Sequence, residues 1–183
     1  ILGDISQSAL LAIKQMNSRL VLVDGKTYAD DIDVVEPEMA KITTQILDDF
    51  YTAGRRQIGF IGGINELFEL DGTTNGQAAD VRATVYEQWV AAHQLRAHSF
   101  SGAWHVETGR QGTMALLDAQ PRIDALLVAS DPIAIGAMNA LKMRGLEPGK
   151  DIDLVSFDNL ELAAYLVPAL TTVDLKPAAL GQQ

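Results

Sequence analysis

Three acidic residues come just after short apolar runs of the chain, where a parallel sheet would end its strands. Asp24 follows Leu-Val-Leu-Val, Asp131 comes just after the run at 126–129, and Asp158 follows Leu-Val-Ser-Phe. In an open parallel sheet, small ligands bind along the edge formed by the carboxyl ends of the strands. Carboxylates accept hydrogen bonds from hydroxyl groups. The pattern therefore indicates a site for a small polar ligand.

An arginine and a tryptophan extend this set of candidate residues. Arg82 lies in the first turn of a predicted helix, after a polar segment, and its planar fork of donors suits vicinal hydroxyls or a carboxylate. Trp104 has small or polar neighbours, and the flat face of a sugar stacks on such a ring. Acids that accept hydrogen bonds, an arginine that donates them and an aromatic ring that stacks on the ligand together favour a pocket for a polyol.

Each of these residues also has a plain structural interpretation, and both interpretations stay open. Arg82 would be a solvated helix arginine, which is the commoner case, and Trp104 would be a core residue. Asp131 would be a helix N-cap, with Pro132 in the first turn, as is common for aspartate in this position. Asp158 would be a turn residue before Asn159.

Other chemistries lack the residues that they need. The glycines of segment 57–63 are not followed by the lysine of a phosphate-binding loop, and they lack the Gly-x-Gly-x-x-Gly spacing of a dinucleotide-binding site. The chain has no Cys and no Gly-x-Ser-x-Gly elbow. His93, His98 and His105 lack zinc-ligand spacing, and the first two are expected at helix ends or on the surface. We predict no catalysis, no metal and no cofactor.

Alternating apolar runs and amphipathic segments position these residues. Apolar runs predict strands at 19–23, 32–35, 57–62, 98–100, 125–128 and 154–157. Periodic apolar residues predict helices at about 10–16, 39–50, 81–89, 106–119 and 131–144. Residues 64–78 are polar and rich in Gly and Asn, and they are expected to form a loop. Strands alternating with helices predict an α/β fold with a parallel sheet.

The charge of the chain excludes one class of partner. Its net charge is −10, with 14 Lys and Arg against 24 Asp and Glu and no basic run. Surfaces that bind nucleic acid carry clustered basic residues, so this chain should not hold DNA. No apolar run approaches the length of a membrane span, and no signal peptide opens the chain. The start at Ile1 without Met suggests a fragment.

Five segments spread along the chain carry a family pattern. They are Gly-Arg-Arg-Gln-Ile-Gly-Phe-Ile-Gly-Gly (54–63), Asp-Val-Arg (80–82), Ala-Ser-Asp-Pro-Ile-Ala-Ile-Gly-Ala-Met-Asn-Ala-Leu (129–141), Asp-Ile-Asp-Leu-Val-Ser-Phe-Asp-Asn (151–159) and Pro-Ala-Leu-Thr-Thr-Val (168–173). In this order they closely resemble the effector-binding core of lactose-repressor-type transcriptional regulators, the LacI/GalR family. The resemblance covers nearly all 183 residues.

The resemblance implies a periplasmic-binding-protein-like fold. Such proteins have two lobes, each a parallel sheet flanked by helices, with the sugar between them. Residues 1–34 would be the end of an N-terminal lobe that is incomplete in this chain. Residues 35–170 would form the C-terminal lobe, and residues 171–183 would cross back towards the first lobe. The family's helix-turn-helix headpiece would be missing.

The resemblance also implies roles for the candidate residues. Arg82 looks like the arginine that clamps the inducer, Asp158 like the acid that binds sugar hydroxyls, and Asp24 like the acid from the other lobe. Trp104 matches a tryptophan that packs on the sugar, which favours a galactoside or a related sugar. Asp131 stands where the family often has Asn, and an acid cannot donate as an amide does. Leu175 is apolar where several members place a ligand-facing Gln.

These features predict a sugar-responsive transcriptional regulator, in particular a repressor. A sugar effector would favour one relative arrangement of the lobes and would thereby change how the missing headpiece binds DNA. The protein would be a cytoplasmic homodimer without a membrane partner, with an interface on the helices near 106–119 and 132–144. The alternative is a periplasmic sugar-binding protein of a transporter, with similar pocket chemistry. An α/β enzyme acting on a sugar lacks any recognisable nucleophile or acid–base pair.

Overall fold

The computed structural model describes residue 1 and residues 3–17, 19–25 and 31–182, which form two compact units. Unit 1 comprises Ile1–Met39, Ile64–Ala79 and Lys176–Gln183, and unit 2 comprises Ala40–Gly63 and Asp80–Leu175. The units are therefore not the continuous ranges 1–34 and 35–170 of the sequence analysis, because residues 64–79 return to unit 1. The assignment of those ranges to family lobes stays a prediction.

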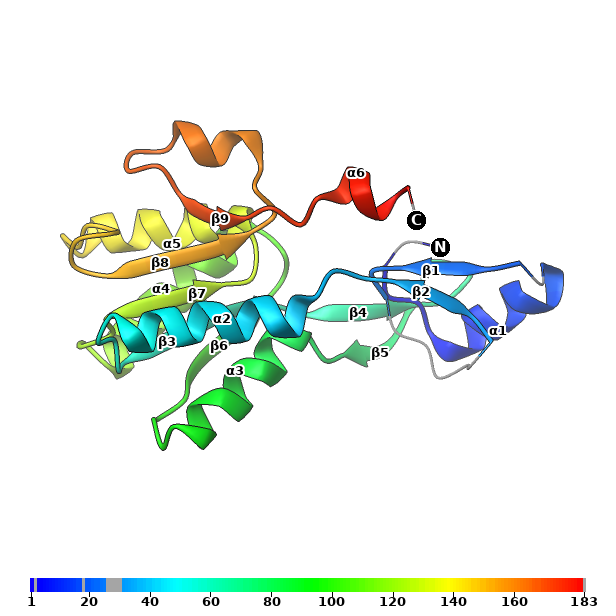
Figure 1. Ribbon diagram of the computed structural model, residues 1–183, viewed down its shortest axis with the longest axis horizontal. Helices are drawn as coiled ribbons and strands as arrows, with labels where there is room; N and C mark the ends of the chain where they lie inside the picture. The colour runs from blue at the N-terminus through cyan, green and yellow to red at the C-terminus, as the bar shows by residue number, and fades with distance from the viewer. Residues whose placement is uncertain (2, 18, 26–30, 183) are drawn as a thin grey trace. The chain divides into compact units, whose positions relative to one another are not determined.

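Unit 2 is built on a five-stranded parallel sheet in the order β6-β3-β7-β8-β9 (Figure 1). Its strands are β3 (Ile58–Gly63), β6 (His98–Gly102), β7 (Ala125–Val128), β8 (Asp153–Phe157) and β9 (Thr171–Val173). β3 and β7 lie inside the sheet and are buried along their whole length, as apolar runs predict for central parallel strands. The predicted α/β fold with a parallel sheet is confirmed.

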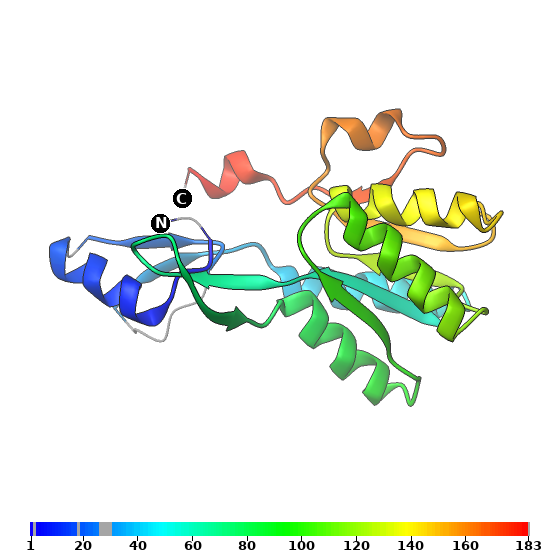
Figure 2. The same cartoon turned by 180° about the vertical axis from the view of Figure 1, so that it is seen from behind.

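Helices cover both faces of this sheet, α2 and α3 on one face and α4 and α5 on the other (Figures 1 and 2). The helices are α2 (Met39–Thr52), α3 (Val81–Ala92), α4 (Val106–Ala119) and α5 (Asp131–Met143), followed by the 3-10 helix η1 (Glu161–Tyr165). Phe60 of β3 stacks on Tyr86 of α3, with ring centroids 5.5 Å apart. Burial raises the pKa of Tyr86 to about 12, and its hydroxyl donates to the carbonyl of Ile58 at 2.8 Å.

Two glycines allow α4 and α5 to approach each other backbone to backbone. A Cβ on Gly109 would lie 1.8 Å from the carbonyl oxygen of Ile133, and one on Gly136 would lie 1.8 Å from that of Val106. Only a residue without a side chain fits at such a crossing. Both helices then pack on the sheet through an apolar core that includes Ile61, Leu126, Leu141 and others.

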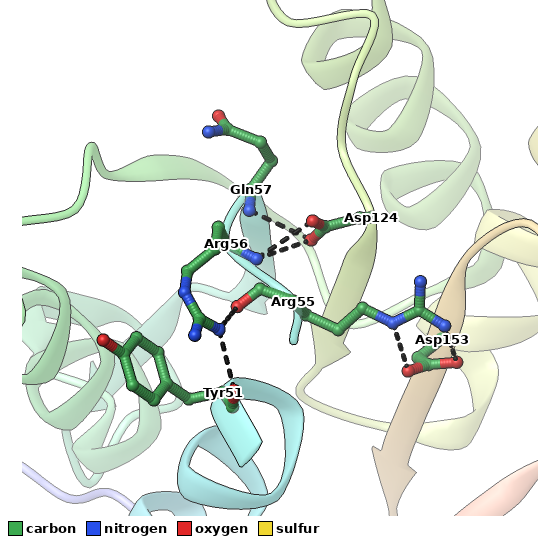
Figure 3. Close-up of polar contacts among 6 residues, drawn as sticks. All are labelled: Tyr51, Arg55, Arg56, Gln57, Asp124 and Asp153. Atoms are coloured by element: carbon green, nitrogen blue, oxygen red, sulfur yellow. Dashed lines mark hydrogen bonds and ion pairs between the residues drawn. The ribbon is translucent and has the colours of Figure 1, made fainter. Parts of the chain in front are cut away.

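Charged side chains join the starting ends of the strands in unit 2 (Figure 3). The Asp124 carboxylate accepts from the backbone N–H groups of Arg56 and Gln57, which lie at the start of β3. The Arg55 guanidinium donates to Asp153 of β8 through Nε at 2.7 Å and Nη2 at 3.0 Å. The Asp153 carboxylate raises the pKa of Arg55. This edge of the sheet is therefore occupied by contacts within the protein.

Unit 1 is smaller. It contains α1 (Gln7–Met16), a parallel pair of strands, β1 (Val21–Val23) with β2 (Asp33–Val35), an antiparallel hairpin, β4 (Asn65–Phe68) with β5 (Thr74–Ala78), and α6 (Pro177–Leu180). The strand predicted at 19–23 is present as β1. An apolar run of this kind is typical of a buried strand, but of its three residues only Leu22 is buried. Leu22 packs with Leu10 and Ile32 in a small core.

The prediction of a loop at residues 64–78 is wrong, since this stretch forms the β4–β5 hairpin. The connection contains Asp71-Gly72, a dipeptide typical of hairpins, and Gly72 has a φ of 83°. Glu69 N–H donates to the carbonyl of Thr73 and Gly72 N–H to that of Glu69, so the turn is hydrogen-bonded. In the part of the chain that the structure describes, no helix is both long and apolar enough to cross a membrane.

Candidate ligand-binding site

Arg82 reaches the carboxyl edge of the unit 2 sheet from the start of α3. Asp80 caps that helix, since its carboxylate accepts from the backbone N–H of Arg82 at 2.8 Å. The same carboxylate accepts from Arg82 Nε at 2.9 Å and from Nη2 at 3.0 Å. Nη1 donates to the carbonyl of Ala129, just after β7, at 2.7 Å. One local turn thus orients the guanidinium, and a distant strand end holds it.

The hydrogen bonds of the described residues leave part of this guanidinium for a ligand. A guanidinium carries five N–H donors. Nε, one N–H of Nη2 and one N–H of Nη1 are engaged by Asp80 and Ala129. One N–H therefore remains on each terminal nitrogen. Because both side chains of the pair are largely buried, at 12% and 6% exposure, the direction of these donors is fixed.

Two aromatic rings flank the guanidinium of Arg82. Its central carbon lies 5.1 Å from the ring centroid of Trp104 and 5.4 Å from that of Phe157, within the range of cation–π attraction. Trp104 lies after β6, and its ring packs directly on Gly63, where a Cβ would come within 2.0 Å of the ring. The ring is nevertheless 38% exposed, so it is not a core tryptophan and can cover a ligand.

Asp131 does not cap α5. Ser130 is the N-cap, with its hydroxyl accepting from the Ile133 N–H, and Asp131 is the first helical residue. The Asp131 carboxylate is 1% exposed and accepts from the Ser156 hydroxyl at 2.5 Å and from the Leu160 N–H at 2.7 Å. Both oxygens are thus used within unit 2. A negative charge is favourable at this helix start, and the arrangement braces the chain that follows β8.

Asp158 lies in the segment that Asp131 braces. It follows β8 in a left-handed conformation, with φ of 106°, and its N–H donates to the carbonyl of Val173 at 3.0 Å. Asn159 also has a positive φ, of 52°, and donates to the Thr172 hydroxyl. Asp158 is only half-buried. As a residue, Asp158 is therefore more exposed than Asp131.

Unit 2 brings four of the five predicted residues to one edge of its sheet: Arg82, Trp104, Asp131 and Asp158. Asp24 belongs to unit 1, where it is exposed after β1, with φ of 51° and its N–H donating to Val35. Asp80 was not among the predicted site residues. The signal for it was an acid before the first helical residue, two positions from a candidate arginine.

All three histidines have defined structural positions, and His105 is the N-cap of α4. His93 is the C-cap of α3, as predicted for a helix end. The prediction that His98 is a helix-end or surface residue is wrong, since it lies in β6 and is 7% exposed. Its Nε2 has no hydrogen-bond partner among the described residues, and burial together with the Arg96 charge lowers its pKa. The described residues also contain no cluster of acids and histidines that could hold a metal ion.

Known proteins similar to this chain include periplasmic-binding-protein-like domains and transcriptional regulators. Residues 47–183 match the family model described as Periplasmic binding protein-like domain. The transcriptional regulator GalR of Lacticaseibacillus casei, a helix-turn-helix type protein, is 29% identical over 99% of this chain and 55% of its own length. The chain therefore spans about half the length of this curated relative.

Solved structures show the same fold. A sugar-binding transcriptional regulator of the LacI family from Escherichia coli, complexed with phosphate, matches with a TM-score of 0.80 and 22% identity, over 100% of this chain and 65% of that chain. The lac repressor dimer bound to operator and the anti-inducer ONPF matches with a TM-score of 0.81 and 24% identity, over 100% and 61%. At these identities the structures show the fold, and together with the family model and the GalR match they confirm the predicted resemblance to lactose-repressor-type regulators.

Proposed function

Because the chain belongs to the family of periplasmic-binding-protein-like domains, we propose that it is the effector-binding core of a sugar-responsive transcriptional repressor. The observation that carries this proposal is the fixed Arg82 guanidinium beside the half-exposed ring of Trp104. Donors held in place and a flat apolar surface are the two elements that a sugar ring requires, for its hydroxyls and its C–H face.

The remaining acids divide by accessibility. We propose Asp158 as the acceptor for sugar hydroxyls in unit 2, because this residue is only half-buried. Asp24 is exposed in unit 1, and its role as an acceptor for sugar hydroxyls stays a prediction. Asp131, which the sequence analysis placed in contact with the ligand, instead holds the segment of Asp158, because both its oxygens accept hydrogen bonds within the protein.

Control of transcription requires parts outside these residues. With a net charge of −10, the chain itself does not suit DNA, so operator contact belongs to a helix-turn-helix elsewhere in the intact protein. The sugar acts by binding two conformations with different affinity, which couples the sugar site to the DNA site by about 1–3 kcal/mol. The matched relatives are regulators, which favours this role over that of a transporter component.

A homodimer is part of the proposal. The segment from Leu160 to Val167 exposes large apolar side chains, among them Tyr165 at 73% and Val167 at 95%. Contiguous exposed apolar surface of this kind is typical of a protein interface. We place the two-fold contact here in preference to the predicted surfaces of α4 and α5, because each of those helices exposes only one large apolar side chain among the described residues, Val106 and Met143.

Calorimetry of the intact protein against a panel of neutral mono- and disaccharides tests the sugar site, with Arg82→Ala as the variant. We expect Arg82→Ala to weaken binding roughly 10- to 100-fold, since hydrogen bonds to charged groups contribute about 1.5–3 kcal/mol. Arg55→Ala is the control, because it breaks the other two-point Arg–Asp contact at the opposite edge of the sheet. Equal affinity in wild type and Arg82→Ala would contradict the proposed contact.

A further inference from the structure

The positive charge of Arg82 is balanced inside unit 2. Asp80 contacts it with both carboxylate oxygens, and the pair is almost excluded from water. A guanidinium that is paired in this way still donates hydrogen bonds through its remaining N–H groups. It offers little net charge to a ligand, however, because the carboxylate lies within contact distance of the same group.

The partial positive charge of the helix starts at this edge is also offset by acidic residues. The N-terminus of a helix attracts anions through its dipole and its free N–H groups. α3 starts at Asp80, α4 carries Glu107 in its first turn, and α5 carries Asp131 in its first turn. Glu107 is itself paired with Arg110. Each of these three helix starts thus carries a carboxylate of the protein, and that of Asp80 accepts from a backbone N–H of its own helix.

From this arrangement we infer that Asp80 determines specificity, and that it makes the site select neutral sugars and reject sugar acids and sugar phosphates. The inference rests on the proposed function, and it names the class of ligand. The two free N–H groups of Arg82 donate to vicinal hydroxyls, which need no countercharge. A ligand carboxylate at the same place would face the carboxylate of Asp80 across the guanidinium, which costs binding free energy.

The experiment compares matched ligands in the intact protein. The sugar panel is extended to pairs that differ only at carbon 6, such as D-galactose with D-galacturonate and D-glucose with D-glucuronate. Affinities are measured by calorimetry for wild type, Asp80→Asn and Asp80→Ser. Asn and Ser both cap helices about as well as Asp, so α3 is retained, and thermal unfolding verifies this. Ser is too short to pair with the guanidinium, whereas Asn retains one acceptor.

In wild type we expect the neutral member of a pair to bind at least about tenfold more tightly than the acid. In Asp80→Ser we expect this ratio to move towards the acid by about tenfold or more, with a smaller shift in Asp80→Asn. Asp153→Asn is the matched control, because it weakens the other two-point Arg–Asp pair far from this edge, and its ratio should equal that of wild type.

A wild-type preference for the acid, or a ratio that is the same in wild type and Asp80→Ser, would overturn the role of Asp80 and leave the sugar site itself intact. A wild type that binds no carbohydrate of the panel, neutral or acidic, would overturn the proposed function and the inference with it. The two failures are therefore distinguishable.

Discussion

Burial separates residues of the same type into different roles in unit 2. Asp131 and Asp158 both follow strands of the same sheet, yet only Asp158 is accessible, while Asp131 uses both oxygens within the protein. His98 is an equally clear case, because its ring is buried in a β-strand and its Nε2 has no hydrogen-bond partner in the described part of the chain. A buried imidazole of this kind resists protonation, since its charged form would lose hydration without gaining a partner.

His98 predicts a pH dependence of stability. Its pKa in the folded protein lies below the ordinary value of 6.5. As the pH falls below that value, the unfolded chain binds a proton that the folded chain does not, so the free energy of unfolding decreases until the folded pKa is reached. We expect wild type to lose more of its free energy of unfolding than His98→Gln between pH 7.5 and pH 5 in urea unfolding.

The difference between the two proteins isolates His98, since the carboxylates titrate in both. An identical loss of stability in wild type and His98→Gln would show that the buried ring does not resist protonation.

At the scale of elements, two neighbouring residues at the start of α5 have different roles: one caps the helix, and the other joins it to β8. Ser130 supplies the cap through one neutral hydrogen bond, 3.4 Å long. Asp131 supplies two short charge-assisted hydrogen bonds to Ser156 and Leu160, which join α5 to β8 and to the segment after it. From secondary structure alone, the two residues would be expected to stabilise the helix start equally. Asp131, however, is charged, and its partners lie much further along the chain than the partner of Ser130.

Substitution of these two residues tests the difference. We expect Ser130→Ala to lower the free energy of unfolding by about 1 kcal/mol, the usual value for a cap. Asp131→Ala should cost about 3 kcal/mol or more, because it leaves the buried Ser156 hydroxyl and the Leu160 N–H without their acceptor. Urea unfolding of the two variants measures both values. A larger loss in Ser130→Ala than in Asp131→Ala would contradict the brace.

At the scale of the whole molecule, the two units differ in the size of their cores. Unit 2 has an extended core of strand and helix residues around β3 and β7, with both strands buried throughout. The core of unit 1 consists of Leu10, Leu22 and Ile32 with a few partly buried neighbours. Buried apolar area is the main source of folding free energy, so the two units should differ in local stability.

Hydrogen exchange of the 183-residue chain measures this difference. We expect the backbone amides of β7 to exchange at least about 100-fold more slowly than those of β1, which corresponds to about 3 kcal/mol of local stability. The amides of Leu126 and Leu22 make a suitable comparison, because both side chains are fully buried in their own units. Equal protection of the two would show that unit 1 is stabilised as strongly as unit 2.

Most helices and strands were predictable from local patterns. The helix 106–119 and the strand 125–128 have the bounds that periodicity predicted, because apolar spacing is a property of neighbouring residues. The β4–β5 hairpin was missed although Asp71-Gly72 signals it, since its strands expose most of their residues and lack an apolar run. When a strand is exposed on most of its length, its sequence has no apolar periodicity, and a polar composition does not distinguish it from a loop.

The candidate site shows the same division between local and distant causes. Asp158 was singled out by its type and its position after a predicted strand, because chain order alone places strand ends on one edge. Arg82 was singled out by its place at a predicted helix start, and Trp104 by its small or polar neighbours. Exposure and hydrogen-bond partners depend on segments far along the chain, such as Ala129 for Arg82 and Ser156 for Asp131. Folding therefore decided that Asp131 is a brace and that the charge of Arg82 is already balanced, since both follow from contacts that no local pattern encodes.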